Sequence, residues 1–231
     1  MKRFWDAADA VEVEGGFTVH LDGRPIRTPG KALLNVPSLA MAEAMAKEWD
    51  AQDKEINPET MPVTKSANSA VDKVTPQFAA VADMLAEYAG TDLLCYRAAQ
   101  PVELTNRQAQ RWDPLLEWCA QTFDARLKPV SGIMFAAQPG ESLIKLSAVV
   151  HAMSPFELTG MHDLITLPGS FVLGLAAIRD YANPDDLWEL SRLDERYQQE
   201  QWGIDEDAEE MADTKRKAFK HAYNFYQMSK A

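Results

Sequence analysis

Near residue 37 the spacing of hydrophobic residues changes from every second position to every third or fourth, and this change constrains the fold most. Before it, VEVEGGFTVHLDGRPIRTPGKALLNV (residues 11–36) alternates apolar and polar residues in short bursts, as half-buried strands do. Gly15-Gly16 and Asp22-Gly23 separate the bursts, and such pairs favour two-residue hairpin turns. The sequence predicts an antiparallel meander of about three or four strands, the last at 34–36.

Beyond residue 37 the apolar positions follow helical spacing. Ser38 is placed as the N-cap of a first helix. One stripe of this helix is apolar, and it comprises Leu39, Ala42, Met45, Ala46 and Trp49. Trp49 is therefore expected to be a structural residue of the core.

The order of the elements indicates the fold class. Prolines break the helical pattern in NPETMPVT, and the chain after it is essentially helical. Strands first and helices after favour an α+β fold over a doubly wound sheet. We expect a small antiparallel β-rich N-terminal domain with one helix over residues 1–62, and a larger all-helical domain over residues 63–231.

Proline marks several points in the helical part. Asp113-Pro114 indicates a kink or a fresh start next to Trp112, which is expected to be structural. Ser154-Pro155-Phe156-Glu157 is a capping box. Asn183-Pro184 begins a helix that is expected to run to Trp202, and a last helix is expected over 207–227.

Composition limits the partners and the compartment. A net charge of −12 disfavours nucleic acid and anionic membranes, and it suits a basic partner surface. The longest apolar run, FVLGLAAI, is too short to span a bilayer, so no membrane insertion is expected. Two cysteines without a Cys-x-x-Cys pair indicate a reducing compartment, and the start lacks a signal pattern, so a cytoplasmic location is expected.

No local signature of catalysis is present. None of the four histidines has a second histidine three or four positions away, and there is no nucleophile elbow or phosphate-binding glycine loop. Cys95 follows two leucines and is better explained as a buried small hydrophobe than as a nucleophile. We expect no enzyme activity, no metal and no cofactor. Many active sites assemble without local signatures, so a metabolic enzyme with a pocket of distant acids stays an alternative.

The helix that contains SRLDERYQQEQWG has an acid on its apolar face. That face consists of Leu187, Leu190, Asp194, Tyr197 and Gln201. A carboxylate there needs a partner. Asp194 meets an internal Arg or Tyr, or the face is only partly covered, or the face is open and Asp194 meets a basic group of another protein.

An aromatic residue ends this helix. Trp202 precedes Gly203 and a run of six acids within IDEDAEEMAD. Trp202 lies on a second face with Trp188, Arg192, Glu195 and Gln199. Exposed aromatic residues bordered by charge are typical of protein interfaces, although acids at a helix start are also often only solvated.

Several blocks of the chain together resemble one known family. They are RFW, GGFTVHLDGRPIRTP, EWDAQ, TDLLCYR, WDPLLEW and LSRLDERYQQEQWG, in this order over nearly the whole chain. They are similar to the assembly chaperones that bind the alpha subunit of the ATP synthase catalytic (F-one) sector in mitochondria and alphaproteobacteria. This resemblance implies a β-rich N-terminal and a helical C-terminal domain, no enzyme activity and no nucleotide requirement. It also implies that the chaperone holds the unassembled alpha subunit until the beta subunit replaces it.

The resemblance assigns roles to particular residues. Trp49, Asp194, Trp202 and Gly203 match the family's motifs, and Glu206 is carried over from the acidic segment. With Glu195 and Tyr197 from the same helix, the expected partner-binding residues are Asp194, Glu195, Tyr197, Trp202, Gly203 and Glu206. The free chaperone is expected to be a monomer. The enzyme and an acidic adaptor for another basic partner stay as alternatives.

Overall fold

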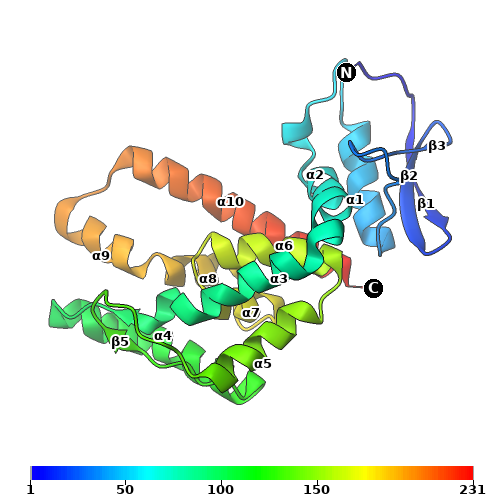
Figure 1. The fold of residues 1–231 in the computed structure, drawn as a ribbon. Coiled ribbons are helices and arrows are strands. Elements are labelled where there is room, and N and C mark those ends of the chain that lie inside the picture. The colour runs from blue at the N-terminus through cyan, green and yellow to red at the C-terminus, as the bar shows by residue number, and fades with distance from the viewer. Residues whose placement is uncertain (1, 231) are drawn as a thin grey trace. The chain divides into compact units, whose positions relative to one another are not determined.

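The computed structural model describes residues 2–230, in which an antiparallel sheet comes first and helices follow (Figure 1). This confirms the predicted α+β class. The chain divides into two units. Unit 1 comprises the chain up to Phe78, Met153–Gly160 and the chain from Asn224, and unit 2 comprises Ala79–Ala152 and Met161–Tyr223. The sequence predicted a domain boundary after residue 62. This division into units does not measure whether either part folds on its own, so the boundary stays a prediction.

Glycine turns shape the sheet of unit 1. Strands β1 (Ala8–Val13), β2 (Gly16–Leu21) and β3 (Arg24–Pro25) pair antiparallel in the order β1-β2-β3. The strand predicted at 34–36 is reduced to one bridge, in which Phe17 and Val36 exchange backbone hydrogen bonds of 2.9 and 2.7 Å. Gly16 allows this close approach, because a Cβ there would lie 2.5 Å from the Val36 carbonyl oxygen.

Helix α1 (Leu39–Asp50) packs on this sheet and is capped as predicted, since Ser38 Oγ accepts a hydrogen bond of 3.2 Å from the Met41 amide. The core of unit 1 combines Trp5 with residues of the sheet, α1 and the later helices, and Phe225 from the last helix belongs to it. Trp49 packs against this core and is half-buried. The N-terminal sheet therefore shares its core with the far end of the chain.

The rest of unit 1 continues in short helices. They are η1 (Pro58–Thr60), α2 (Pro62–Ser69), the π-helix η2 (Ala70–Val74) and η3 (Thr75–Gln77). The Glu48 carboxylate closes the start of α2, because it accepts hydrogen bonds from the Val63 amide at 2.7 Å and the Thr64 amide at 2.8 Å. Burial raises the pKa of Glu48, although these hydrogen bonds oppose that effect.

Unit 2 is built around one buried helix. Its elements begin with α3 (Phe78–Glu87), η4 (Tyr88–Thr91), η5 (Leu93–Cys95), β4 (Tyr96–Arg97), α4 (Val102–Phe123), β5 (Val130–Ser131) and α5 (Gly140–His151). They continue with α6 (Pro155–Thr166), α7 (Phe171–Ile178), α8 (Pro184–Ser191), α9 (Leu193–Trp202) and α10 (Glu206–Ser229). The first half of α6, up to Gly160, and the end of α10, from Asn224, belong to unit 1. Every residue of α7 is buried, and this helix packs against α4, α8 and η4. The apolar run FVLGLAAI is therefore the centre of this unit.

Two sequence expectations about helix ends are corrected. Helix α4 continues through Pro114, so Asp113 does not begin a new helix, and Trp112, Leu115 and Leu116 are buried on both sides of the proline. The helix predicted from 184 to 202 is broken at Arg192, which has φ −104° and ψ 17°. Because of this break, α9 is a separate helix. The residue faces predicted for one continuous helix from 184 to 202 therefore do not extend past Arg192.

A short parallel pair was not predicted. Strands β4 and β5 form a two-stranded parallel sheet in which Tyr96 faces Val130 and Arg97 faces Ser131. Two-residue strands carry no usable alternation of apolar and polar residues. This pair becomes important for the surface of unit 2.

Candidate functional site

Trp202 lies at the end of α9 with its side chain in solvent. Its exposed fraction is 80%, and Ile204 and Met211 nearby in sequence are also exposed. The link between α9 and α10 is short and closed at both ends. Gly203 donates to the Gln199 carbonyl at 2.9 Å, and Asp205 Oδ1 accepts from the Ala208 amide at 3.1 Å. Trp202 and Ile204 therefore lie at a hydrogen-bonded turn, and Met211 follows within α10.

A glycine is needed at position 203 because of its backbone conformation and not because a side chain would clash with neighbouring atoms. Its φ is +91°, a conformation that side chains disfavour, while a Cβ would meet nothing within 4 Å. Glu206 follows as the exposed first residue of α10. The link thus brings together three predicted site residues, Trp202, Gly203 and Glu206.

Asp194 lies at the start of α9 and has a partner inside the chain. Gln108 Nε2 donates a hydrogen bond of 2.7 Å to Asp194 Oδ1. Gln108 is fully buried on α4, and its Oε1 accepts from the Ala98 amide at 2.8 Å. Sequence reasoning expected an internal Arg or Tyr, and the structure instead gives an amide 86 positions earlier in the chain. Asp194 is half-buried, so its charge keeps contact with water.

The other two predicted residues of α9 differ in burial. Tyr197 is half-buried, and the Arg107 guanidinium lies 5.2 Å from the centre of its ring. Glu200, one turn later, pairs with Arg107 at 2.7 Å. Glu195 is exposed and lies 3.9 Å from Arg192. Contacts to α4 therefore fix one side of α9, and Glu195 lies on the other side.

An ion network joins α8, α9 and the start of α10. Arg196 pairs with Glu189 at 2.8 Å and with Glu209 at 3.0 Å, and Arg192 also reaches Glu209 at 3.2 Å. A hydrogen bond from Gln199, followed by those from the two arginines, lowers the pKa of Glu209 to about 2 although desolvation opposes them. The sequence did not reveal this network, because Glu209 was one acid in an acidic run.

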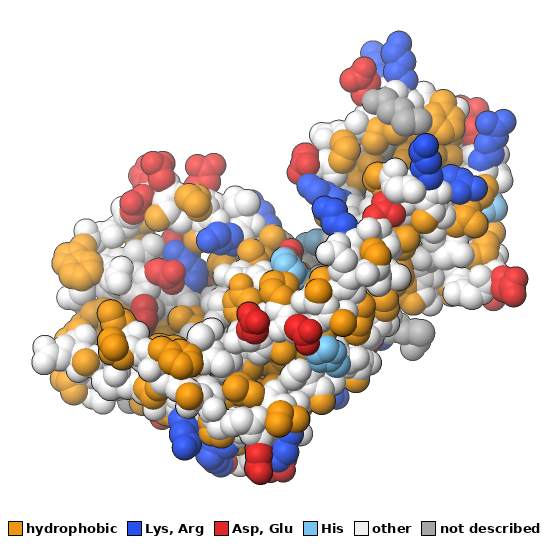
Figure 2. Space-filling view, viewed as in Figure 1, with side chains coloured by type: hydrophobic (Ala, Val, Ile, Leu, Met, Phe, Trp, Pro, Cys, Tyr) orange, Lys and Arg blue, Asp and Glu red, His pale blue; other side chains and the backbone are white. Residues whose placement is uncertain are grey.

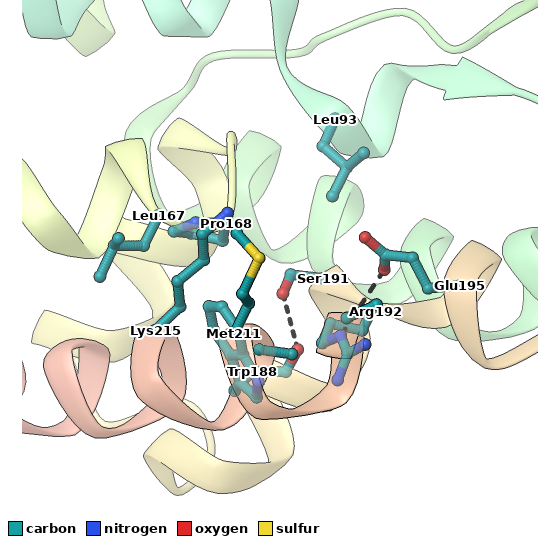
Figure 3. A pocket seen from close by; sticks show the side chains of 11 residues that line it. Leu93, Leu167, Pro168, Trp188, Ser191, Arg192, Glu195, Met211 and Lys215 are labelled. Carbon is teal, nitrogen blue, oxygen red and sulfur yellow. Dashed lines mark hydrogen bonds and ion pairs between the residues drawn. The ribbon is translucent and has the colours of Figure 1, made fainter. Parts of the chain in front are cut away.

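A cavity of about 310 Å³ opens beside this network. Figure 3 shows Arg192 and Glu195 on one side of it, and Met211 and Lys215 near Leu167 and Pro168. Trp188 also lines the cavity. Such a hollow, mostly apolar with a few charges, can accept a side chain of a partner.

The two tryptophans predicted to be structural have different surroundings. Trp112 is fully buried, and its Nε1 donates to the Leu190 carbonyl at 2.9 Å. Trp49 packs edge to face on Trp5, with ring centres 5.2 Å apart. The Trp49 Nε1 is buried and has no hydrogen-bond partner among the described residues.

Three further exposed residues were missed by the sequence reasoning. Ile133, Met134 and Phe135 follow β5 and have exposed fractions of 94%, 80% and 71%. The signal was present as an uncharged run between Gly132 and Pro139. We call these three residues the apolar tip.

The described part of the chain contains neither a cluster of metal ligands nor a helix suited to span a membrane. Within residues 2–230, no group of three or more His, Cys, Asp or Glu side chains is placed to hold a metal ion. No helix in the same range combines the length and the apolar character needed to cross a membrane.

Comparison with known proteins shows one consistent similarity. The sequence pattern of a family described as ATP12 chaperone protein matches residues 2–120. Over 224 residues the chain is 25% identical to the protein "Protein atp12, mitochondrial" of Schizosaccharomyces pombe, covering 91% of this chain and 76% of that one.

Solved structures agree with this similarity. The crystal structure of Atp12 from Paracoccus denitrificans is 47% identical, with a TM-score of 0.97 over 99% of this chain and 98% of that one. An aspartate-to-lysine mutant of the same protein has 46% identity and the same TM-score of 0.97. A protein of Agrobacterium tumefaciens described as a chaperone is 37% identical, with a TM-score of 0.92 over 98% of this chain and 85% of that one.

Proposed function

The chain belongs to the ATP12 chaperone family, and from that membership we propose that it binds the unassembled alpha subunit of ATP synthase and prevents its aggregation. The chaperone acts without ATP hydrolysis and without a cofactor while the catalytic sector assembles. It works as a monomer in the bacterial cytoplasm, or in the mitochondrial matrix for relatives. The beta subunit then takes its place on the alpha subunit.

The observation that carries this proposal is the exposed apolar group at the α9–α10 link. Trp202, Ile204 and Met211 are exposed, and several acids lie between and beside them in the sequence. A subunit without its neighbour exposes an apolar interface that aggregates, and covering it needs apolar area on the chaperone. Tryptophan supplies much area at little cost in conformational entropy, so Trp202 is the expected principal contact.

The other predicted site residues support this contact in two ways. Gly203 and the hydrogen bond from Gln108 to Asp194 set the position and direction of the link. Glu195 and Glu206 are exposed and can attract basic groups of the client. Tyr197 contributes its half-buried ring beside Arg107. A moderate affinity for the alpha subunit lets the beta subunit displace the chaperone.

The enzyme alternative has less support. The cavity beside α9 brings together Arg192, Glu195 and Lys215, and the first two approach each other within 3.9 Å. An exposed aromatic side chain at a hydrogen-bonded turn is instead typical of a protein-binding surface. The absence of catalysis is part of the proposal.

The proposal is tested by aggregation of the purified alpha subunit, followed by light scattering. We expect Trp202→Ala to weaken binding at least about tenfold and to abolish most of the protection, because central aromatic contacts dominate interfaces. Its melting temperature should stay close to that of the wild type, since the side chain is exposed.

Phe4→Ala is the matched control, because Phe4 is an exposed aromatic residue in unit 1. It should protect the alpha subunit as the wild type does. Full protection by Trp202→Ala would contradict the assignment of this site. Failure of the wild type to bind the alpha subunit would refute the function itself.

A further inference from the structure

The apolar tip, Ile133, Met134 and Phe135, is a second exposed apolar group in unit 2, separate in sequence from the α9–α10 link. We propose that the apolar tip is a second contact for the client protein and binds an uncharged apolar patch on it. This inference rests on the proposed function and assigns it a surface that the sequence motifs do not include.

The base of the loop that carries the apolar tip is fixed by hydrogen bonds. The Gly132 amide donates to the Arg97 carbonyl at 2.8 Å and extends the parallel pairing of β4 and β5. Gln138, which is buried, accepts from the Lys128 amide at 2.8 Å and donates to the Lys128 carbonyl at 3.0 Å. The loop is therefore closed at its base, and its apolar residues project beyond that closure with little to cover them.

The surroundings of the apolar tip lack charge. Because β4 and β5 are parallel, the segments that follow them leave at the same end of the pair. These segments, residues 98–102 and 132–139, contain no charged residue, in a chain of which 25% of the residues are charged. Val102 in the first segment is also exposed. An occupant of these segments therefore gains from apolar contact, and charged residues such as Lys128 and Glu103 lie outside them in the sequence.

The charge of candidate partners and the surface area of the apolar tip indicate which kind of molecule can bind there. A second copy also carries a net charge of −12, and an anionic membrane has the same sign, so both are repelled at long range. Three large side chains offer on the order of 500 Å² in all, which is below the roughly 800 Å² per partner of a stable interface. The apolar tip is therefore suited to one part of a larger contact with a neutral or basic protein.

Gln108 connects the two apolar groups of unit 2. Its Oε1 accepts from Ala98 directly after β4, and its Nε2 donates to Asp194 at the start of α9. The base of the loop and the helix that ends in Trp202 are thus held by one buried amide. Figure 2 shows hydrophobic side chains on a single face over both the α9–α10 end and the β5 segment. One client can meet both groups.

The test replaces the apolar tip by serine, in the triple variant I133S/M134S/F135S. Affinity for the purified alpha subunit is measured by titration calorimetry, and the melting temperature and oligomeric state are measured in parallel. We expect affinity to fall at least about tenfold with an unchanged melting temperature, because the three side chains are exposed. The control is Ile144→Ser, which removes an exposed isoleucine of α5 and should change affinity less than about twofold.

The outcomes separate this inference from the proposed function. If the wild type binds the alpha subunit, Trp202→Ala does not, and the serine triple variant binds like the wild type, the apolar tip is not a contact and the function stands. If the wild type does not bind, both proposals are refuted. A dimer of the wild type that the triple variant abolishes would show that a second copy occupies the apolar tip.

Discussion

Asp92 shows how a single buried acid is accommodated in unit 2. It is fully buried and accepts hydrogen bonds from the Leu94 amide at 2.9 Å, the Val172 amide at 2.9 Å and Ser170 Oγ at 2.8 Å. It closes the start of the buried helix α7 and of η5. Burial raises the pKa of Asp92 from 3.8 to about 6, because desolvation outweighs these hydrogen bonds.

This pKa predicts an unusual pH dependence of stability. A folded-state pKa above the unfolded value means that the folded protein holds the proton more tightly. The contribution of Asp92 is therefore greatest below about pH 4 and is lost as the pH rises through about 6. Between about pH 4.5 and 7, we expect the free energy of unfolding to lose about 2 kcal/mol from this group.

The measurement compares urea unfolding of the wild type and Asp92→Asn at several pH values. The difference in unfolding free energy between the two proteins should shrink as the pH rises, because the amide does not titrate. Subtraction removes the common effect of other acids such as Glu209. A difference that is constant or that grows with pH would contradict the raised pKa.

Residue-level features were predictable when the cause was local. The Trp202-Gly203 ending and the acids after it indicated an exposed aromatic residue, and its side chain is exposed. The cap at Ser38 was visible for the same reason. The partner of Asp194 could not be predicted, because Gln108 is distant in sequence and an uncharged amide is not recognised as a partner from a charge pattern.

At the scale of elements, the ion network holds the start of α10 against α8 and α9. Glu209 is its shared acceptor, and it binds Arg192, Arg196 and Gln199. Removing one charge from this shared position affects three contacts. The acid next to it, Glu210, is exposed and has no side-chain ion pair or hydrogen bond among those of residues 2–230.

We therefore predict different effects of two adjacent substitutions. Glu209→Gln should destabilise the junction of α9 and α10 by on the order of 1 kcal/mol, while Glu210→Gln should have little effect. Hydrogen exchange of the amides of residues 196–210 should quicken only in Glu209→Gln. High salt should reduce the difference between the two variants, because it screens the ion pairs.

Equal exchange in the two variants would show that apolar packing, and not the ion network, holds this junction. Affinity for the alpha subunit provides a second measurement. Glu209→Gln should lower it moderately by loosening the link that carries Trp202.

The elements themselves were predicted unevenly. The hairpin turn at Asp22-Gly23 and the helical stripe after Ser38 are local patterns, and the corresponding elements are present. The first hairpin is present too, but its turn lies at Glu14-Gly15, one residue earlier than predicted, and Gly16 already belongs to β2. The break at Arg192 was missed because no proline or glycine marks it in the sequence. Its contact with Glu209 joins two different helices, which no local pattern reveals. The parallel pair of β4 and β5 was missed because each strand has only two residues.

For the molecule as a whole, the main electrostatic property is the net charge of −12. A protein with this charge attracts basic clients over several ångströms and repels copies of itself. The link after Gly203 concentrates the effect, since Asp205, Glu206 and Asp207 are consecutive. Charge of this kind acts mainly on the rate of association and less on the strength of the final contact.

We expect the association rate with the alpha subunit to fall several-fold between about 50 and 300 mM salt, with a much smaller change in the dissociation rate. The double variant E206Q/D207N should have a slower association rate at low salt and a weaker dependence on salt. Stopped-flow fluorescence of a dye-labelled alpha subunit provides the signal, because the six tryptophans of the chain would mask the emission of Trp202. An association rate independent of salt would show that long-range charge has no part in binding.

The fold class of the whole chain followed from the order of strands and helices, and the structure confirms it. The composition of the two units did not follow, because unit 1 takes in Met153–Gly160 and the chain from Asn224. No local sequence pattern predicts that one helix belongs partly to one unit and partly to the other, as α6 and α10 do. Such assignments depend on which distant apolar faces meet.

The place of Phe225 in the first core has a consequence for biosynthesis. The ribosome releases the sheet and α1 long before it reaches Phe225, which is almost fully buried against them. During that interval the early part of the nascent chain lacks a component of its interior. A member of a chaperone family thus passes through its own period with an unfinished core, which ends only when its last helix emerges.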